Sequence, residues 1–266
     1  MDDKKKENIA RLGIATKGVV YSLIGGITAL SVVGVTGQKA GSSGVLDYVA
    51  KQPFGRVVLG ILALGLICFV LWRCYQAIMD PENHGKDLKG IVNRLAYLSS
   101  GAFYAVLAYA AVKRIISGLS SGSGGGGKES MLQFLLDKPL GQILVTIVGC
   151  CFLGKAIYQL YKAYSGKYRD EIEHAGLDSK AQKVILNAGK VGYTARGIVI
   201  IIVSYLIFKA AWYNNSNQAG GKEEAFQVLQ SNFGSLIMAL VAIGLLAYGI
   251  FMFVKAKYRP INIKNN

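Results

Sequence analysis

Residues Arg11-Leu-Gly-Ile-Ala-Thr-Lys-Gly-Val-Val-Tyr21 begin an apolar stretch that recurs twice in this chain of 266 residues. The second copy reads Arg94-Leu-Ala-Tyr-Leu-Ser-Ser-Gly-Ala-Phe-Tyr104, and the third reads Lys190-Val-Gly-Tyr-Thr-Ala-Arg-Gly-Ile-Val-Ile200. Each copy is followed by a second apolar run, which opens with Pro53-Phe54-Gly55, Pro139-Leu140-Gly141 or Asn232-Phe233-Gly234. Both motifs of the third copy lie 179 residues after those of the first. The chain is therefore an internal triplication of a unit that holds two apolar runs.

Each apolar run is long enough to cross a membrane. The six runs, at about 12–33, 56–78, 94–116, 140–162, 191–212 and 234–254, each approach or exceed the roughly 20 residues that a helix needs to cross a hydrocarbon core of about 30 Å. Hydrophobic residues make up 52% of the chain and charged residues 17%, a composition too apolar for an ordinary soluble domain. The sequence predicts an all-α integral membrane protein with six transmembrane helices, arranged as three parallel tandem hairpins in a pseudo-three-fold bundle.

The predicted repeats occupy residues 1–85, 86–173 and 174–266. Between the two runs of each repeat, a turn rich in Gly or Ser precedes a short amphipathic stretch, at 45–50, 131–136 and 225–230. We expect each stretch to form a short helix on the outer membrane surface. On the inner side, the segment that starts at Asp178 is typical of a capped helix leading into the fifth run.

The net charge of +15 is distributed unevenly between the two sides of the membrane. With the N-terminus inside, the inner segments hold 21 of the 30 Lys and Arg residues. This positive-inside pattern predicts that both termini are cytoplasmic, and it favours contacts with anionic lipid head groups on the cytoplasmic face. Nucleic-acid binding is the weaker interpretation, because the basic residues flank the apolar runs and do not form one aromatic-interleaved patch.

Residues suited to catalysis or metal binding are scarce. The four cysteines all fall inside apolar runs, and none has metal-ligand spacing to the two histidines. The apolar runs contain no Asp or Glu, and such a carboxylate is the usual mark of a proton-coupled or cation transporter. We therefore predict no enzymatic activity, no metal and no cofactor.

The repeat resembles a bacterial family of membrane proteins, the domain-of-unknown-function family numbered 1206. The resemblance is carried by Gly192-Tyr-Thr-Ala-Arg-Gly197 and Gly13-Ile-Ala-Thr-Lys-Gly18, by a Tyr one turn later, and by the Pro-Phe-Gly opening of the partner run. It covers nearly the whole chain, and it implies a multi-pass protein of the bacterial cytoplasmic (inner) membrane without a known activity. The departures from the pattern are Ala96, Ser100, Ile200 and Asn232.

Two basic residues form the core of a candidate anion site. Lys17 and Arg196 lie beside glycines near the cytoplasmic start of outward-running helices, where the helix dipole is positive. A cation at such a position suits a phospholipid head group or a phosphorylated metabolite. Arg11 and Arg94, which begin the first two repeats, belong to the same candidate set. The alternative is that these side chains only face lipid phosphates at the membrane surface.

A second candidate set would line an axial cavity. It consists of Tyr21, Tyr104, Ser204 and Lys155. On a helical period, the first two tyrosines share a face with Gly18 and Gly101, and helix packing explains small residues at such positions equally well. Lys155 lies about 14 residues past Gly141, roughly 21 Å into the membrane, so it either extends to the inner interface or faces a polar cavity.

Two functions agree with this pattern. The first is a non-enzymatic membrane protein that binds anionic lipid or a membrane-protein partner through basic residues. The alternative is a small channel or transporter with a pathway along the pseudo-three-fold axis.

Overall fold

The computed structural model describes residues 3–34, 42–81, 85, 87–117, 136, 140–172, 178–215 and 222–258, and no strand occurs within these ranges. Two elements are short, namely α2 (Ser42–Ala50) and the 3₁₀ helix η2 (Arg169–Glu171). Six helices are long enough and apolar enough to cross a membrane, which confirms the six predicted runs. They are α1 (Asp3–Val32), α3 (Gly55–Met79), α4 (Leu88–Ser117), α6 (Gly141–Tyr164), α7 (Ser179–Trp212) and α8 (Lys222–Tyr258).

A backbone break precedes the second membrane-spanning helix of each repeat, at the Pro-Phe-Gly motif or its equivalent. Phe54 and Leu140 adopt left-handed conformations (φ 61° and 67°) directly before the first residues of α3 and α6. In the third repeat the break falls on Gly234 (φ 81°, ψ 169°), which separates the amphipathic part of α8 from its membrane-spanning part. The amphipathic stretch 45–50 lies in α2, as expected, whereas most of the stretch 131–136 lies outside the described residues.

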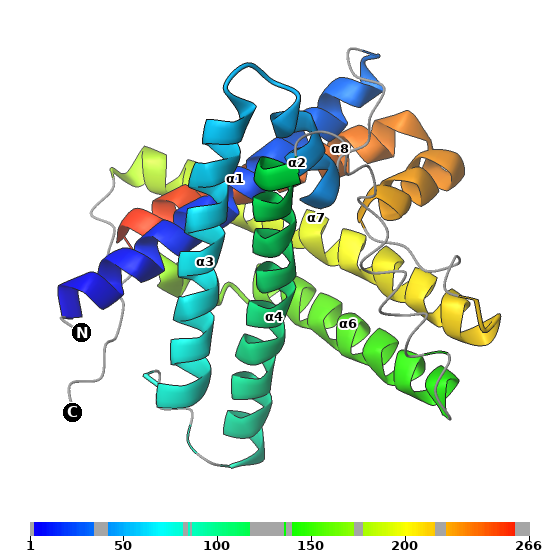
Figure 1. Ribbon diagram of the computed structural model, residues 1–266, viewed down its shortest axis with the longest axis horizontal. Coiled ribbons are helices and arrows are strands. Elements are labelled where there is room, and N and C mark those ends of the chain that lie inside the picture. The colour runs from blue at the N-terminus through cyan, green and yellow to red at the C-terminus, as the bar shows by residue number, and fades with distance from the viewer. Residues whose placement is uncertain are drawn as a thin grey trace.

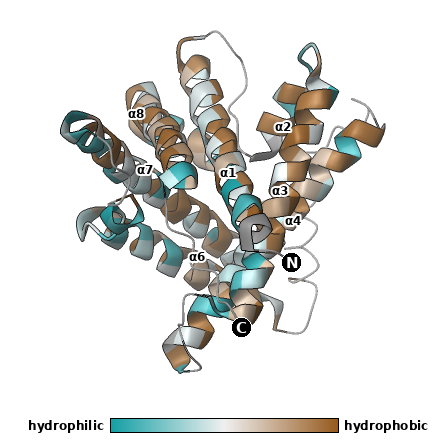
Figure 2. Cartoon of the chain, turned by 90° about the vertical axis from the view of Figure 1, so that its left-hand side faces the viewer, coloured by the Kyte–Doolittle hydropathy of each residue, from teal (hydrophilic) through white to brown (hydrophobic). Residues whose placement is uncertain are grey.

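The outer faces of the long helices are apolar. Large exposed side chains include Ile61 and Leu64 on α3, Val106 on α4, Ile147 on α6 and Leu240 on α8. Apolar residues dominate the long helices in Figure 2. A soluble protein would bury such side chains, so these faces are the surface that contacts lipid.

The long helices pack in the order α4, α3, α1, α8, α7, α6. Three extensive interfaces join neighbouring repeats, namely α3 with α4, α6 with α7, and α8 with α1. The hairpins of repeats 1 and 3 are closed, because α1 packs on α3 and α7 packs on α8. In the middle repeat, α4 and α6 form no comparable interface among the described residues, and they diverge in Figure 1. Pseudo-three-fold symmetry therefore stays a prediction.

Equivalent glycines make the contacts between repeats. A Cβ atom placed on Gly18 would lie 3.0 Å from the Gly249 carbonyl oxygen of α8, and one on Gly197 would lie 2.7 Å from Leu160 of α6. The equivalent Gly101 faces Arg73 of α3. Close approach of helix backbones requires small residues at such positions, so these contacts support the packing interpretation of this face.

Candidate functional site

Cationic and aromatic side chains from all six long helices meet inside the bundle. We call this group the central cluster. Its members are Lys17 and Tyr21 of α1, Phe69 and Arg73 of α3, Tyr104 of α4, Lys155 of α6, Tyr193 and Arg196 of α7, and Tyr248 of α8.

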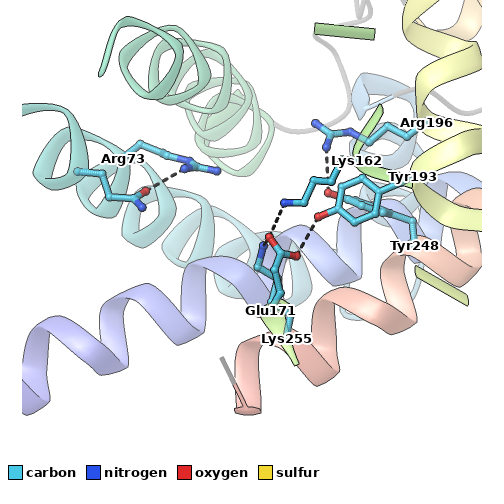
Figure 3. Close-up of polar contacts among 8 residues, drawn as sticks. Arg73, Lys162, Glu171, Tyr193, Arg196, Tyr248 and Lys255 are labelled. Atoms are coloured by element: carbon cyan, nitrogen blue, oxygen red, sulfur yellow. Dashed lines mark hydrogen bonds and ion pairs between the residues drawn. The ribbon is translucent and has the colours of Figure 1, made fainter. Parts of the chain in front are cut away.

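Arg196 connects three helices. Its side chain is only 8% exposed. The guanidinium donates from Nε to the Tyr21 hydroxyl at 3.0 Å and from Nη1 to the Tyr248 hydroxyl at 2.9 Å. Figure 3 shows the second of these bonds. The two tyrosine rings meet edge to face with their centroids 4.9 Å apart. Arg196 thus holds α1 and α8 to α7 through hydroxyl groups and without a carboxylate.

Lys17 is enclosed by aromatic rings. It is 8% exposed, and its Nζ lies 5.8 Å from the ring centroid of Phe69 and 5.5 Å from that of Tyr248. Cation–π attraction of this kind stabilises a desolvated ammonium by about 2 kcal/mol. Arg73 also approaches Phe69, with its guanidinium carbon 4.9 Å from the ring centroid, and it donates to Gln76 Oε1 at 2.8 Å.

Lys155 differs from the other cations because its side chain is exposed. It is nevertheless close enough to Arg196 and Tyr21 to interact with both electrostatically. Tyr104 is buried and interacts with Tyr21 in the same way. The structure therefore brings members of both candidate sets into a single cluster.

Three candidate residues make contacts elsewhere. Ser204 donates to the Gly149 carbonyl oxygen at 2.8 Å, within the interface between α6 and α7. Arg11 donates to the carbonyl oxygens of Ala256 and Lys257 at the end of α8. Arg94 does the same for Ala77 and Ile78 at the end of α3, at 2.7 and 3.0 Å. Both arginines satisfy carbonyl groups that a helix C-terminus leaves unpaired.

A second polar group, the Glu171 network, lies next to the central cluster. Glu171 of η2 is 8% exposed, and its Oε1 accepts from Lys162 Nζ at 2.6 Å and from Lys255 Nζ at 2.5 Å. Its Oε2 accepts from the Tyr193 hydroxyl at 3.0 Å (Figure 3). The Tyr193 ring packs edge to face on Tyr248, so the two groups share these aromatic rings. Glu171 lies in the linker between α6 and α7, outside the apolar runs, so the absence of Asp and Glu from those runs gave no sign of it.

The central cluster carries an excess of positive charge. Within the described ranges, neither a salt bridge nor a hydrogen bond links Lys17, Lys155 or Arg196 to a carboxylate. Glu171 already binds two lysines. In the same ranges no group of three or more His, Cys, Asp or Glu side chains could hold a metal ion. The cluster therefore presents cationic and hydroxyl groups, which are chemical groups that can contact an anion.

The comparison with known proteins rests on the repeat. The family described as Domain of Unknown Function (DUF1206) matches residues 12–80, 95–166 and 191–259. The chain belongs to this family. The uncharacterized protein YxxB of Bacillus subtilis (strain 168) is 28% identical over 254 residues, which cover 95% of this chain and 91% of the relative. No solved structure matches the chain.

The DUF1206 match makes the cluster a meeting point of equivalent positions. One position of the repeat holds Lys17, Ser100 and Arg196, and another holds Phe69, Lys155 and Tyr248. Because the repeat alignment pairs Tyr248 with Lys155, it could have identified Tyr248 from the sequence. Arg73 could have been identified as an ionisable residue inside an apolar run. Neither the DUF1206 description nor the name of the relative points to an enzymatic activity.

Proposed function

We propose that this multi-pass membrane protein binds the anionic head group of a membrane lipid within its helix bundle. The observation that carries the proposal is the burial of Lys17 and Arg196 beside Lys155, with no carboxylate paired to any of the three in the described ranges. An ionised side chain inside a membrane is costly unless it has a partner, and it often marks a binding site. A bound anion would supply that partner.

The surrounding groups suit a phosphate-bearing ligand. Arginine recognises phosphate through paired N–H donors, and lysine adds a compact point charge. The hydroxyls of Tyr21 and Tyr248 already orient the Arg196 guanidinium, so one of its edges is fixed before a ligand binds. Preorganisation of this kind lowers the entropic cost of binding.

The proposal includes an orientation and a location. The basic inner segments favour a bacterial cytoplasmic membrane with both termini in the cytoplasm. Anionic lipids are abundant in the cytoplasmic leaflet, so a lipid is the available source of phosphate groups. A membrane-protein partner that docks on the basic inner surface is compatible with the same site.

Native mass spectrometry of the protein in mild detergent tests the proposal. Added dioleoyl phosphatidic acid should remain bound, whereas dioleoyl phosphatidylcholine should dissociate. Arg196→Gln and Lys17→Gln should each weaken retention of phosphatidic acid at least tenfold. Lys183→Gln is the matched control, because it removes one exposed basic charge from α7 far from the cluster. Equal retention by the wild type and the two cluster variants would contradict lipid binding at this site.

The second candidate function is a small channel or transporter, and the exposure of Lys155 next to buried Arg196 favours it. Inorganic phosphate distinguishes the two functions. A lipid-binding site should show little displacement of phosphatidic acid by millimolar phosphate. Phosphate uptake into proteoliposomes that disappears in Arg196→Gln would instead support transport.

A further inference from the structure

The two helices of repeat 1, and likewise those of repeat 3, pack tightly together through equivalent contacts. A Cβ atom on Gly13 would lie 2.6 Å from the Phe69 Cα, and one on Gly192 would lie 2.6 Å from the Tyr248 Cα. One turn away, a Cβ atom placed on Gly244 would lie 2.5 Å from the Ala195 Cβ. These hairpins close only because glycine brings the backbones together.

The middle repeat has a different residue type at each of these positions. Ala96 replaces the glycine of the outward-running helix, Cys151 replaces that of the inward-running helix, and Lys155 replaces the aromatic residue. All three side chains are exposed, whereas Phe69 and Tyr248 are 2% and 1% exposed. The face that closes the other hairpins therefore carries exposed side chains in the middle one, whose helices α4 and α6 diverge (Figure 1).

We propose that the divergence of α4 and α6, which leaves side chains exposed on both helices, forms a lateral portal through which a phosphate-monoester lipid reaches the central cluster, with Lys155 contacting its head group. The inference rests on the proposed function. Lys155 is exposed on the α6 face of the portal, and it directly precedes Ala156, whose carbonyl oxygen lies 3.6 Å from the Cβ that Gly197, next to Arg196, would carry. It therefore connects the membrane-facing surface to the buried cations.

The portal suits an amphipathic ligand better than a free ion. Residues on the same helical faces as Ser99 and Cys151 are exposed and apolar. They are Val92, Leu95 and Val106 on α4, and Leu144 and Ile147 on α6. Such side chains can contact acyl chains, whereas a hydrated ion would have to pass them without compensation.

The charge of the cluster selects the class of head group. Lys17, Lys155 and Arg196 are three mutually repelling basic side chains, and a phosphate monoester, which carries about −1.5 to −2 at neutral pH, favours the charged form of all three. A phosphodiester lipid carries about one negative charge and would leave more of this excess uncompensated. The site should therefore prefer phosphatidic acid to phosphatidylglycerol.

Neighbouring native cysteines allow a direct test of the portal. Cys150 and Cys151 are both exposed, and the repeat equivalence places Cys151 on the α4-facing side. Two proteins would each keep only one of the four cysteines, Cys151 or Cys150, with serine at the other three. Each would be labelled with a fluorescein maleimide, and binding of dioleoyl phosphatidic acid would be measured by native mass spectrometry. Labelling at Cys151 should reduce binding at least tenfold, and labelling at Cys150 should change it less than twofold.

Substitution of Lys155 gives a second readout that does not depend on labelling. Lys155→Tyr restores the residue type of the third repeat and should reduce phosphatidic acid binding at least tenfold, whereas Lys155→Arg should keep it. Unchanged binding in Lys155→Tyr, or in the protein labelled at Cys151, would overturn the portal. If phosphatidic acid binding is unchanged in those proteins but lost in Arg196→Gln, the portal is overturned and the proposed function stands. A wild type that never retains phosphatidic acid would overturn both.

Discussion

At the scale of single residues, glycines define which helices can touch. Gly192 lies against the Tyr248 backbone, and backbone atoms cannot rotate away as a side chain can. Gly154, in α6, has no neighbouring atom within 4 Å of a would-be Cβ. The two glycines therefore make a matched pair for testing the packing.

Gly192→Ala should destabilise the protein by about 1–3 kcal/mol, because the added methyl group overlaps the Tyr248 backbone. The melting temperature in detergent should fall by roughly 2–10 °C. Gly154→Ala should leave it unchanged or slightly raised, since alanine favours the helix and meets no neighbour. Equal melting temperatures for the two variants would contradict the close contact of α7 and α8.

Glu171 is the residue whose loss should cost most near the inner end of the bundle. Glu171→Gln removes the carboxylate that both Lys162 and Lys255 contact, and it leaves the two ammonium groups close together. Breaking a buried ion pair in this way destabilises a protein by about 3–5 kcal/mol. Glu7→Gln breaks an ion pair with Arg11 whose side chains are 30–38% exposed, and it should cost no more than about 1 kcal/mol. Thermal unfolding of the two variants in one detergent compares these losses.

At the scale of helices and hairpins, the sequence predicts the six long helices, but it does not predict that α4 and α6 lack an extensive interface. Length and hydropathy identify all six long helices, because a span of about 20 apolar residues is required whatever the neighbours are. The open middle hairpin depends on the relative positions of α4 and α6, which no local pattern encodes. The sequence shows that Ala96 and Cys151 replace glycines of the other repeats. Only the contacts of Gly13 and Gly244 in the structure show that these glycines lie where the closed hairpins pack.

Cysteine cross-linking tests this difference between hairpins. Ala195→Cys with Gly244→Cys should form a disulfide readily once the two helices separate by about 1 Å, because their Cβ positions lie 2.5 Å apart and a disulfide needs about 3.5–4.5 Å. Ser99→Cys with native Cys151 occupies the equivalent positions of the middle repeat and should cross-link at least tenfold more slowly. Each pair would be placed in a protein whose other native cysteines are serine and oxidised with copper phenanthroline. Comparable rates would show that the middle hairpin closes like the third.

At the scale of the whole molecule, the sequence predicts on which side of the membrane the basic residues lie, but it does not predict the Glu171 network. Glu171 belongs to a linker, and only the folding of that linker against α7 and α8 brings its carboxylate next to Tyr193 and Lys255. The helix predicted to start at Asp178 is continuous with the fifth apolar run, and the two together form α7. Its 34 residues extend over about 51 Å, well beyond a hydrocarbon core of about 30 Å, so one end stands outside the membrane.

The predicted orientation determines which of these regions reacts from outside a cell. Lys51→Cys lies between α2 and α3, and Lys183→Cys lies in the first turns of α7; both side chains are exposed. In intact cells, a membrane-impermeant maleimide should label only the cysteine at position 51. The cysteine at position 183 should react only after the membrane is made permeable. The reverse pattern would invert the assigned topology.

The hydrogen bond from Arg11 to the last turn of α8 shows that the first and last helices of the chain are neighbours, so the order of the helices along the sequence could be changed. Helices α1 and α8 share an extensive interface, whereas the covalent link between α4 and α6 joins two successive long helices with no comparable interface among the described residues. A circular permutant that starts with α6, ends with α4 and joins α8 to α1 by a short linker should keep every extensive interface. It should fold into the same bundle, with three complete pairs α6–α7, α8–α1 and α3–α4 in succession along the chain.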